Sequence, residues 1–77
     1  MVMGYVLLNT EPGLARSVRD VLTSVAGIAE VEETIGRYDL IVRVAVDDET
    51  DLRRVLEDVI CETAGVSFAL PCFRLAA

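Results

Sequence analysis

Five residues with side chains or backbone suited to ligand binding lie together near the middle of the chain: Thr34, Gly36, Arg37, Tyr38 and Asp39. A glycine at a tight turn leaves backbone N–H groups exposed, and such groups can bind a carboxylate. Asp39 could accept a hydrogen bond from an ammonium group. A plain hairpin turn is the simpler alternative, because it also needs a residue that tolerates positive φ. The stretch is therefore either a turn alone or a turn that forms one edge of a pocket.

The other side chains of this stretch have two interpretations as well. Tyr38 could cover the end of a sheet or form a wall for the side chain of a ligand. Thr34 is more often an ordinary strand residue than a hydroxyl donor. Arg37 is expected to be a solvated turn residue, although its guanidinium could bind a carboxylate of a neighbouring subunit.

Catalytic and metal-binding chemistry has little support. The chain has no histidine, and its two cysteines, Cys61 and Cys72, lack the spacing of a zinc site. We expect both to be buried free thiols, the alternative being a reactive pair or a disulfide. The acidic run 47–51 is typical of a helix start rather than of a metal site. Without a nucleophile elbow or a phosphate-binding loop, we predict that the protein is not an enzyme and needs no cofactor.

Length and composition predict one small domain that self-associates. Residues 1–77 make a single domain, and a monomer of this size buries only about 60% of its unfolded surface. Hydrophobic residues make up 53% of the chain, more than one small core needs. The net charge is −6 and all seven basic residues are arginine, which disfavours direct nucleic-acid binding. No apolar run approaches a membrane span and no signal-peptide pattern is present, so we expect a cytoplasmic protein.

The first half of the chain predicts a strand, a helix and a second strand. Residues 2–9 are rich in Val, Leu and Tyr and end before a Pro-Gly pair, as a strand does. Residues 14–25 carry apolar side chains at helical spacing. Residues 28–35 alternate apolar and polar, with Val31 and Ile35 on one side, which indicates a half-exposed strand.

The third strand, residues 40–46, is expected to pair with the second in a hairpin. Its even-numbered residues face one side of the sheet and its odd-numbered residues the other. If the hairpin closes at Ile35 and Leu40, opposite charges face each other across the two strands, which supports that register. The pairs that this register predicts include Glu32 with Arg43 and Val31 with Val44.

The second half of the chain repeats the pattern of the first. Asp48 is placed to cap a second helix, residues 52–60 carry its buried stripe, and Gly65 marks its end. The last strand covers residues 66–75. Pro71 cannot donate a hydrogen bond to a sheet, so this strand should lie at an edge or carry a bulge.

The predicted order is β-α-β-β-α-β, and the two halves look alike at 25–31 and 63–69, where each helix ends and a strand begins. This is the ferredoxin-like α+β fold, with a four-stranded antiparallel sheet and two helices on one face. The other face carries apolar residues such as Ile41 and Ala45. A second copy is the simplest cover for that face, so we expect a dimer formed through the open face of the sheet.

Three segments resemble one known family: "GYVLLNTEPG", "AGIAEVEETIGRYDLIVRV" and the closing "AGV" followed by a strand. They look like the effector-binding domain of the Lrp/AsnC (leucine-responsive regulatory protein) family, also called the RAM domain. The resemblance runs from Met3 to about Leu75. The spacing of Thr, Gly, Tyr and Asp within residues 34–39 is its most specific part.

This resemblance implies an amino-acid sensor. Family members typically join the domain to a DNA-binding helix-turn-helix, form dimers through their sheets and assemble into tetramers or octamers. Small effectors, commonly amino acids, bind between dimers near the loop that is Gly36 to Asp39 here. The chain shows no helix-turn-helix, so it looks like a stand-alone form. It would bind an effector at the five residues named first, associate with itself, and modulate full-length regulators of the family.

One departure from the family pattern supports a rival function. Family sequences often carry hydroxyl residues at alternate positions of the last strand, and the matching residues here are Ala69 and Pro71. Neither has a side-chain donor. The rival is an interaction protein of the same fold that binds no small molecule. A second rival, from another class, is a small catalyst that acts on a hydrophobic substrate in the cleft under the sheet.

Overall fold

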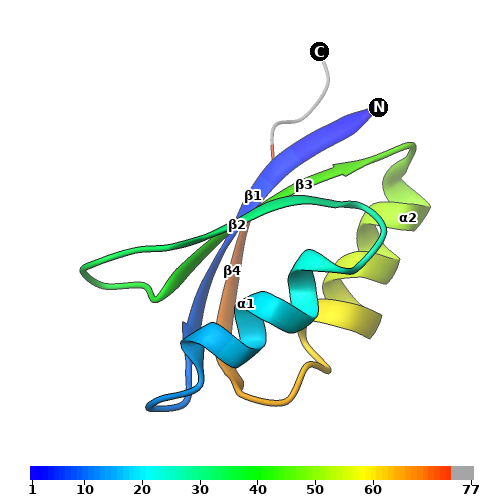
Figure 1. Ribbon diagram of the computed structural model, residues 1–77. Helices are drawn as coiled ribbons and strands as arrows, with labels where there is room; N and C mark the ends of the chain where they lie inside the picture. The colour runs from blue at the N-terminus through cyan, green and yellow to red at the C-terminus, as the bar shows by residue number, and fades with distance from the viewer. Residues whose placement is uncertain (74–77) are drawn as a thin grey trace.

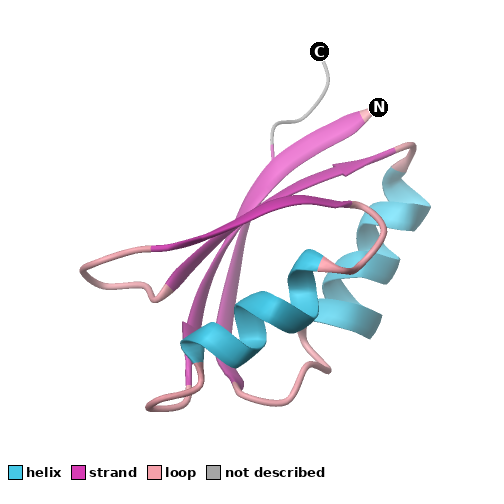
Figure 2. Ribbon diagram, in the orientation of Figure 1, coloured by secondary structure: helices cyan, strands magenta, loops and turns pink. Residues whose placement is uncertain are grey.

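The computed structural model describes residues 1–73 and has the expected ferredoxin-like α+β fold. All neighbouring strands are antiparallel, in the order β2-β3-β1-β4, and both helical segments cover one face of the sheet (Figures 1 and 2). Residues 74 and 75 of the predicted last strand lie outside the described residues. The elements are β1 (Val2–Thr10), α1 (Ala15–Thr23), β2 (Ile28–Glu33), β3 (Leu40–Val46), α2 (Glu49–Arg53), η1 (Arg54–Ile60) and β4 (Val66–Phe73).

The core lies between the sheet and the helices. Burial alternates along β3, where every even-numbered residue is buried and every odd-numbered residue is partly exposed, which confirms the two faces assigned to 40–46. The helices contribute their apolar stripes to the same layer. The buried residues are Val6, Leu8, Val18, Leu22, Leu40, Val42, Val44, Val46, Val55 and Ile60.

The second helix begins as predicted and then widens. The Asp48 side chain accepts a hydrogen bond from the Asp51 N–H over 2.9 Å, which confirms the cap. From Arg54 onward the helix is π-helical, and the Cys61 N–H bonds to the Leu56 carbonyl five residues earlier. In a π-helix, residues five apart lie close to the same face. The widened turn therefore lets Val55 and Ile60 both be fully buried.

The similarity of the two halves is visible at two glycines. Gly27 precedes β2 with a φ of 96°, and Gly65 precedes β4 with a φ of 99°. A Cβ at Gly27 would lie 2.9 Å from Val46, and a Cβ at Gly65 would lie 2.9 Å from Val18. Both positions thus require glycine for the same two reasons, a positive φ and close packing against the core.

The register predicted for the β2–β3 hairpin is wrong by two residues. Glu33 pairs with Leu40, so β2 ends two residues before Ile35 and the connecting loop has six residues, 34–39. The shift leaves every side chain on its predicted face, because side chains alternate with a period of two. The pairs observed in place of the predicted ones are Glu30 with Arg43 and Val31 with Val42.

The position of Pro71 agrees with its chemistry. β4 pairs only with β1 in the observed sheet, so it is an edge strand and Pro71 needs no second partner. The pairing of β1 with β4 shifts register between Asn9 and Thr10. This irregularity lies next to the β2–β3 loop.

The face of the sheet away from the helices, here called the open face, is covered by no helix or strand within residues 1–73. Its apolar side chains include Met3 and Tyr5, which are 53% and 50% exposed. None of the helices in the described part of the chain has the length and apolar character needed to cross a membrane. The open face consists of Met3, Tyr5, Leu7, Asn9, Glu30, Glu32, Ile41, Arg43, Ala45, Phe68, Leu70 and Cys72.

Candidate functional site

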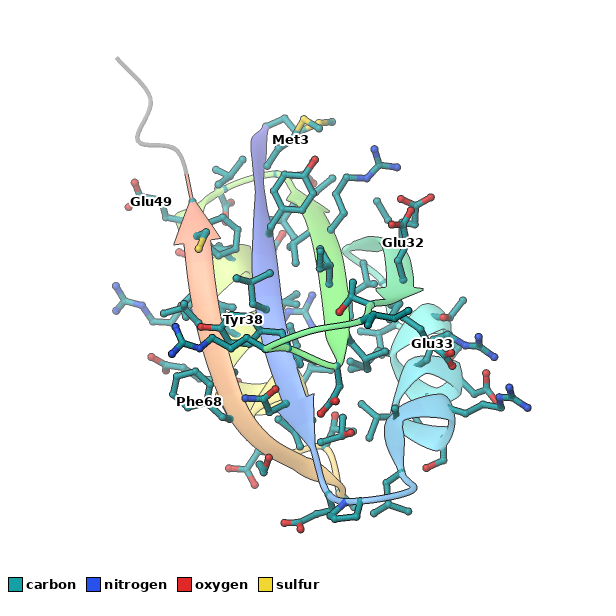
Figure 3. The ribbon with its side chains drawn as sticks, turned by 90° about the vertical axis from the view of Figure 1, so that its left-hand side faces the viewer. Met3, Glu32, Glu33, Tyr38, Glu49 and Phe68 are labelled. Carbon is teal, nitrogen blue, oxygen red and sulfur yellow. The ribbon has the colours of Figure 1, made fainter. Side chains whose placement is uncertain are left out.

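The five candidate residues all lie in the β2–β3 loop, residues 34–39. Figure 1 shows this loop projecting from the end of the sheet on the side away from the helices, and Figure 3, which looks onto the open face, shows it crossing in front of β1. The loop therefore rises from the same surface that is left without a cover.

Short hydrogen bonds within the loop hold its two ends together. The Thr34 N–H donates to the Asp39 carbonyl over 3.0 Å, and the Thr34 hydroxyl donates to the Tyr38 carbonyl over 2.6 Å. The hydroxyl of Thr34 thus closes the loop. Its donor hydrogen is already in use, so Thr34 could serve a ligand only as an acceptor.

Asp39 attaches the loop to the end of β1. Its N–H donates to the Leu8 carbonyl over 2.8 Å, while its Oδ2 accepts from the Thr10 N–H over 2.7 Å and from the Thr10 hydroxyl over 3.3 Å. Thr10 is free to make these bonds because it lies where the β1–β4 register shifts. Oδ1 of Asp39 accepts no hydrogen bond from residues 1–73, so one carboxylate oxygen remains for a ligand.

Tyr38 brings an aromatic surface over the sheet. Its ring lies nearly parallel to that of Phe68 on β4, with 6.5 Å between ring centroids and an interplanar angle of 19° (Figure 3). Tyr38 is half-buried and Phe68 is 49% exposed. The two rings together form an apolar wall beside the loop, so Tyr38 both covers the sheet and presents a surface for a ligand side chain.

The tip of the loop exposes backbone donors. Gly36 has a φ of 128°, and a Cβ there would meet no atom within 4 Å, so only the backbone conformation requires glycine. Within residues 1–73, the N–H groups of residues 35–38 have no hydrogen-bond acceptor. Arg37 is exposed and makes no ion pair with the described residues. The loop can thus offer four backbone N–H groups and one guanidinium to an anion.

The sequence pattern does not reveal the roles of two residues that matter here. Ile35, assigned to a strand face beside Val31, lies at the loop tip and is the most exposed large hydrophobic residue within 1–73, at 106%. Thr10 was not singled out, although a hydroxyl residue at a strand end just before a Pro-Gly pair signals a polar contact. Its partner, Asp39, is too distant in the sequence for the pattern to reveal the bond.

Two further expectations need correction. Cys61 and Cys72 are both free and exposed, not buried: the first follows the helix end and the second lies on the open face of an edge strand. Arg43 approaches Glu30 over 3.9 Å rather than Glu32, as the corrected register requires. That ion pair is half exposed on both sides and is therefore weak.

The positions that replace the family's hydroxyl residues face the helices. Ala69 pairs with Leu8 and Pro71 with Val6, and paired residues of antiparallel strands point to the same face. Leu8 and Val6 are fully buried on the helix side. Ala69 and Pro71 are therefore on the opposite face of β4 from Phe68, the residue that stacks on the loop.

These features define a two-layer α+β domain with an open sheet face and a donor-rich loop that rises from it. The sequence profile of the Lrp/AsnC ligand binding domain matches residues 3–68, and the chain belongs to that family. The family's domain is a regulatory ligand-binding domain, not an enzyme, which confirms the expectation from the sequence. Among proteins of curated function, none matches the chain significantly.

Solved structures agree with this assignment. A hypothetical protein from Pyrococcus horikoshii superimposes with a TM-score of 0.93 at 26% identity, over 100% of this chain and 93% of that one. FFRP-DM1 has a TM-score of 0.93 at 27% identity, over 97% of this chain and 100% of its own. A transcriptional regulator from Neisseria meningitidis, solved as a complex with L-Met, has a TM-score of 0.84 at 14% identity, over 97% of this chain and 50% of its own. That last likeness shows the fold alone.

Proposed function

We propose that this chain is a cytoplasmic regulatory module that binds an amino acid at the β2–β3 loop and self-assembles through its open face. The observation that carries the proposal is the set of unused groups on the loop. The N–H groups of residues 35–38 can receive an α-carboxylate, and Oδ1 of Asp39 can accept from an α-ammonium group. An amino acid carries both groups a short distance apart, as the loop requires.

The aromatic pair supplies the third element of such a site. The stacked rings of Tyr38 and Phe68 lie beside the free N–H groups and offer an apolar surface to a ligand side chain. The family profile describes a ligand binding domain, and the structural relative from Neisseria meningitidis binds L-Met. The profile supports a ligand, and the complex of that relative supports an amino acid as its class.

Assembly follows from the exposed surface. A 77-residue chain that left Met3, Tyr5, Phe68 and Leu70 in water would be barely stable. A second copy would cover these residues and place the two loops at a subunit interface. Mixing with full-length regulators of the family, which share this fold, gives one route from effector binding to transcription.

A rival function has its own support. Asp39 and Thr34 already serve the loop itself, through Thr10 and the Tyr38 carbonyl. The same fold without a ligand would be an interaction protein that only assembles.

A thermal-shift screen with the twenty amino acids separates the two functions. Ligand at 100 times its Kd adds about 2.7 kcal/mol, and each kcal/mol moves the Tm of so small a domain by roughly 4–8 °C. The proposal predicts a shift of that size for at least one amino acid and a much smaller shift in Tyr38→Ala. No shift with any amino acid, from a chain that still elutes as an oligomer, would establish the interaction protein instead.

A further inference from the structure

Ile35 is an apolar side chain with nothing to contact in its own subunit. It is 106% exposed at the tip of a loop that projects from the open face. Neighbouring Gly36 holds the tip in a conformation with a φ of 128°, which other residues rarely adopt. Exposure of a branched aliphatic side chain to water is unfavourable. Ile35 is therefore suited to be buried against another molecule.

A hollow that could receive this side chain lies at the other end of the same face. It has a volume of about 170 Å³ and is lined by Met3, Gly4, Tyr5, Arg43 and Cys72. Met3, Tyr5, Arg43 and Cys72 enclose it with side chains from three neighbouring strands, β1, β3 and β4, while Gly4 contributes backbone. A cavity of roughly 150 Å³ accepts a molecule as large as benzene, so the hollow has room for one isoleucine side chain.

Arg43, which lines the hollow, also has an unsatisfied donor. Nε of Arg43 is buried and has no hydrogen-bond partner among the described residues. An apolar side chain alone would leave this group unpaired, at a cost in free energy. A loop that inserts its tip brings backbone carbonyl oxygens along with the side chain, and one of these can accept from Nε.

We propose that Ile35 of one copy inserts into the hollow of a second copy, and that Ile35 of the second copy inserts into the hollow of the first. The loop and the hollow share one face but lie at opposite ends of the sheet; Figure 3 shows Met3 at one end of β1 and Tyr38 nearer the other. A twofold axis between two facing sheets, directed across the strands, puts each Ile35 over the partner's hollow. One rotation satisfies both contacts, as an isologous interface requires.

This arrangement would couple the effector to assembly. The inference rests on the proposed function, in which residues 35–39 hold the amino acid and the open faces associate. Because Ile35 belongs to the same loop, an effector that orders the loop changes the affinity of one subunit for the other. By linkage, dimerisation changes the affinity for the effector by the same factor as the effector changes the affinity between the subunits.

A disulfide trap tests the geometry directly, since Cys72 already lies in the hollow. In the full chain, Ile35→Cys is combined with Cys61→Ser and incubated with oxidised glutathione. A disulfide forms only when the two Cα atoms come within about 7 Å, so a covalent dimer linked from residue 35 to residue 72 is expected. The same chain with Cys72→Ser should lose that linkage.

Other outcomes are distinguishable. A dimer linked from residue 35 to residue 35 would show that the two loops meet each other and would overturn the inference while leaving the open-face dimer intact. A chain of dimer mass that forms no disulfide would do the same. A mass near 8.4 kDa at micromolar concentration would overturn the assembly itself, and with it this part of the proposed function.

The dimer affinity provides a second readout without oxidation. Ile35→Asp should weaken dimerisation at least ten-fold in sedimentation experiments while leaving the far-UV spectrum unchanged, because Ile35 is fully exposed within its own subunit. Val21→Asp is the matched control: Val21 is 53% exposed on α1, on the helix side, and its replacement should not change the dimer Kd. Equal effects of the two variants would contradict the insertion of Ile35.

Discussion

The backbone N–H of Thr10 donates a hydrogen bond to Oδ2 of Asp39 over 2.7 Å, and this bond joins residues 29 positions apart. It fixes the β2–β3 loop to the end of β1, at the point where the β1–β4 register shifts. The carboxylate that the sequence suggests as a ligand group is thus also the anchor of the loop. Its two roles, stability and binding, need variants that separate them.

Substitutions of Asp39 should do so. Asp39→Ala removes the acceptor for Thr10 and should lower the free energy of unfolding by about 1–3 kcal/mol, because a partly buried N–H loses its partner. Asp39→Asn keeps an amide oxygen in the same place, so its free energy of unfolding should fall by less than half as much. Urea denaturation of both variants measures the difference. Equal losses would mean that the charge of Asp39, not its hydrogen bond, anchors the loop.

The stacking of Tyr38 on Phe68 should appear as a coupling energy. Tyr38→Leu, Phe68→Leu and the double variant form a cycle in which we expect about 0.5–1.5 kcal/mol of coupling in the free energy of unfolding. Tyr5→Leu replaces Tyr38→Leu in the control cycle, because Tyr5 lies opposite Cys72, four residues along β4 from Phe68. A coupling of the same size in both cycles would argue against specific stacking.

The loss of stability on replacing a glycine by alanine should depend on the atoms that surround that glycine. Gly36→Ala strains the backbone alone, and such a conformation costs about 1–3 kcal/mol. Gly27→Ala and Gly65→Ala add a Cβ 2.9 Å from a buried valine, and overpacking costs about 1–3 kcal/mol more. Unfolding by urea should therefore show greater losses at Gly27 and Gly65 than at Gly36. The reverse order would contradict the close packing at the two helix-to-strand junctions.

The two thiols should differ in reactivity once the protein assembles. Cys61 follows the helix end, whereas Cys72 lies on the open face and should be covered by the second copy. With Ellman's reagent, we expect one fast thiol at all protein concentrations and one that slows as the concentration rises. Cys72→Ser should leave only the fast thiol. Two thiols that react equally fast at a concentration where the chain is a dimer would place Cys72 outside the interface.

Some of this structure follows from the sequence by simple rules. Alternation along residues 40–46 was enough to assign both faces of β3, because a strand has a period of two. The register of the hairpin was not accessible in this way. A shift of two residues leaves every side chain on its face, and Glu30 and Glu32 are equally suitable partners for Arg43.

The details of the loop depend on contacts that no local pattern contains. Ile35 continued the alternation of β2 and was assigned to it, yet the strand ends at Glu33, and the segment that follows is held by the bonds of Asp39 to Leu8 and Thr10. Their sequence separation hides these bonds. The exposure of Cys72 depends in the same way on β4 being an edge strand with one open face.

The central claim, that the β2–β3 loop binds an amino acid, is tested most directly by calorimetric titration. The amino acid with the largest thermal shift is titrated into the wild type, Asp39→Asn and Tyr38→Ala. We predict saturable binding to the wild type and a ten- to hundred-fold higher Kd for Asp39→Asn, since a hydrogen bond to a charged group contributes about 1.5–3 kcal/mol. Tyr38→Ala should also bind more weakly. If both variants bind as tightly as the wild type, or if no amino acid gives saturable heat, the loop is a turn and not a binding site.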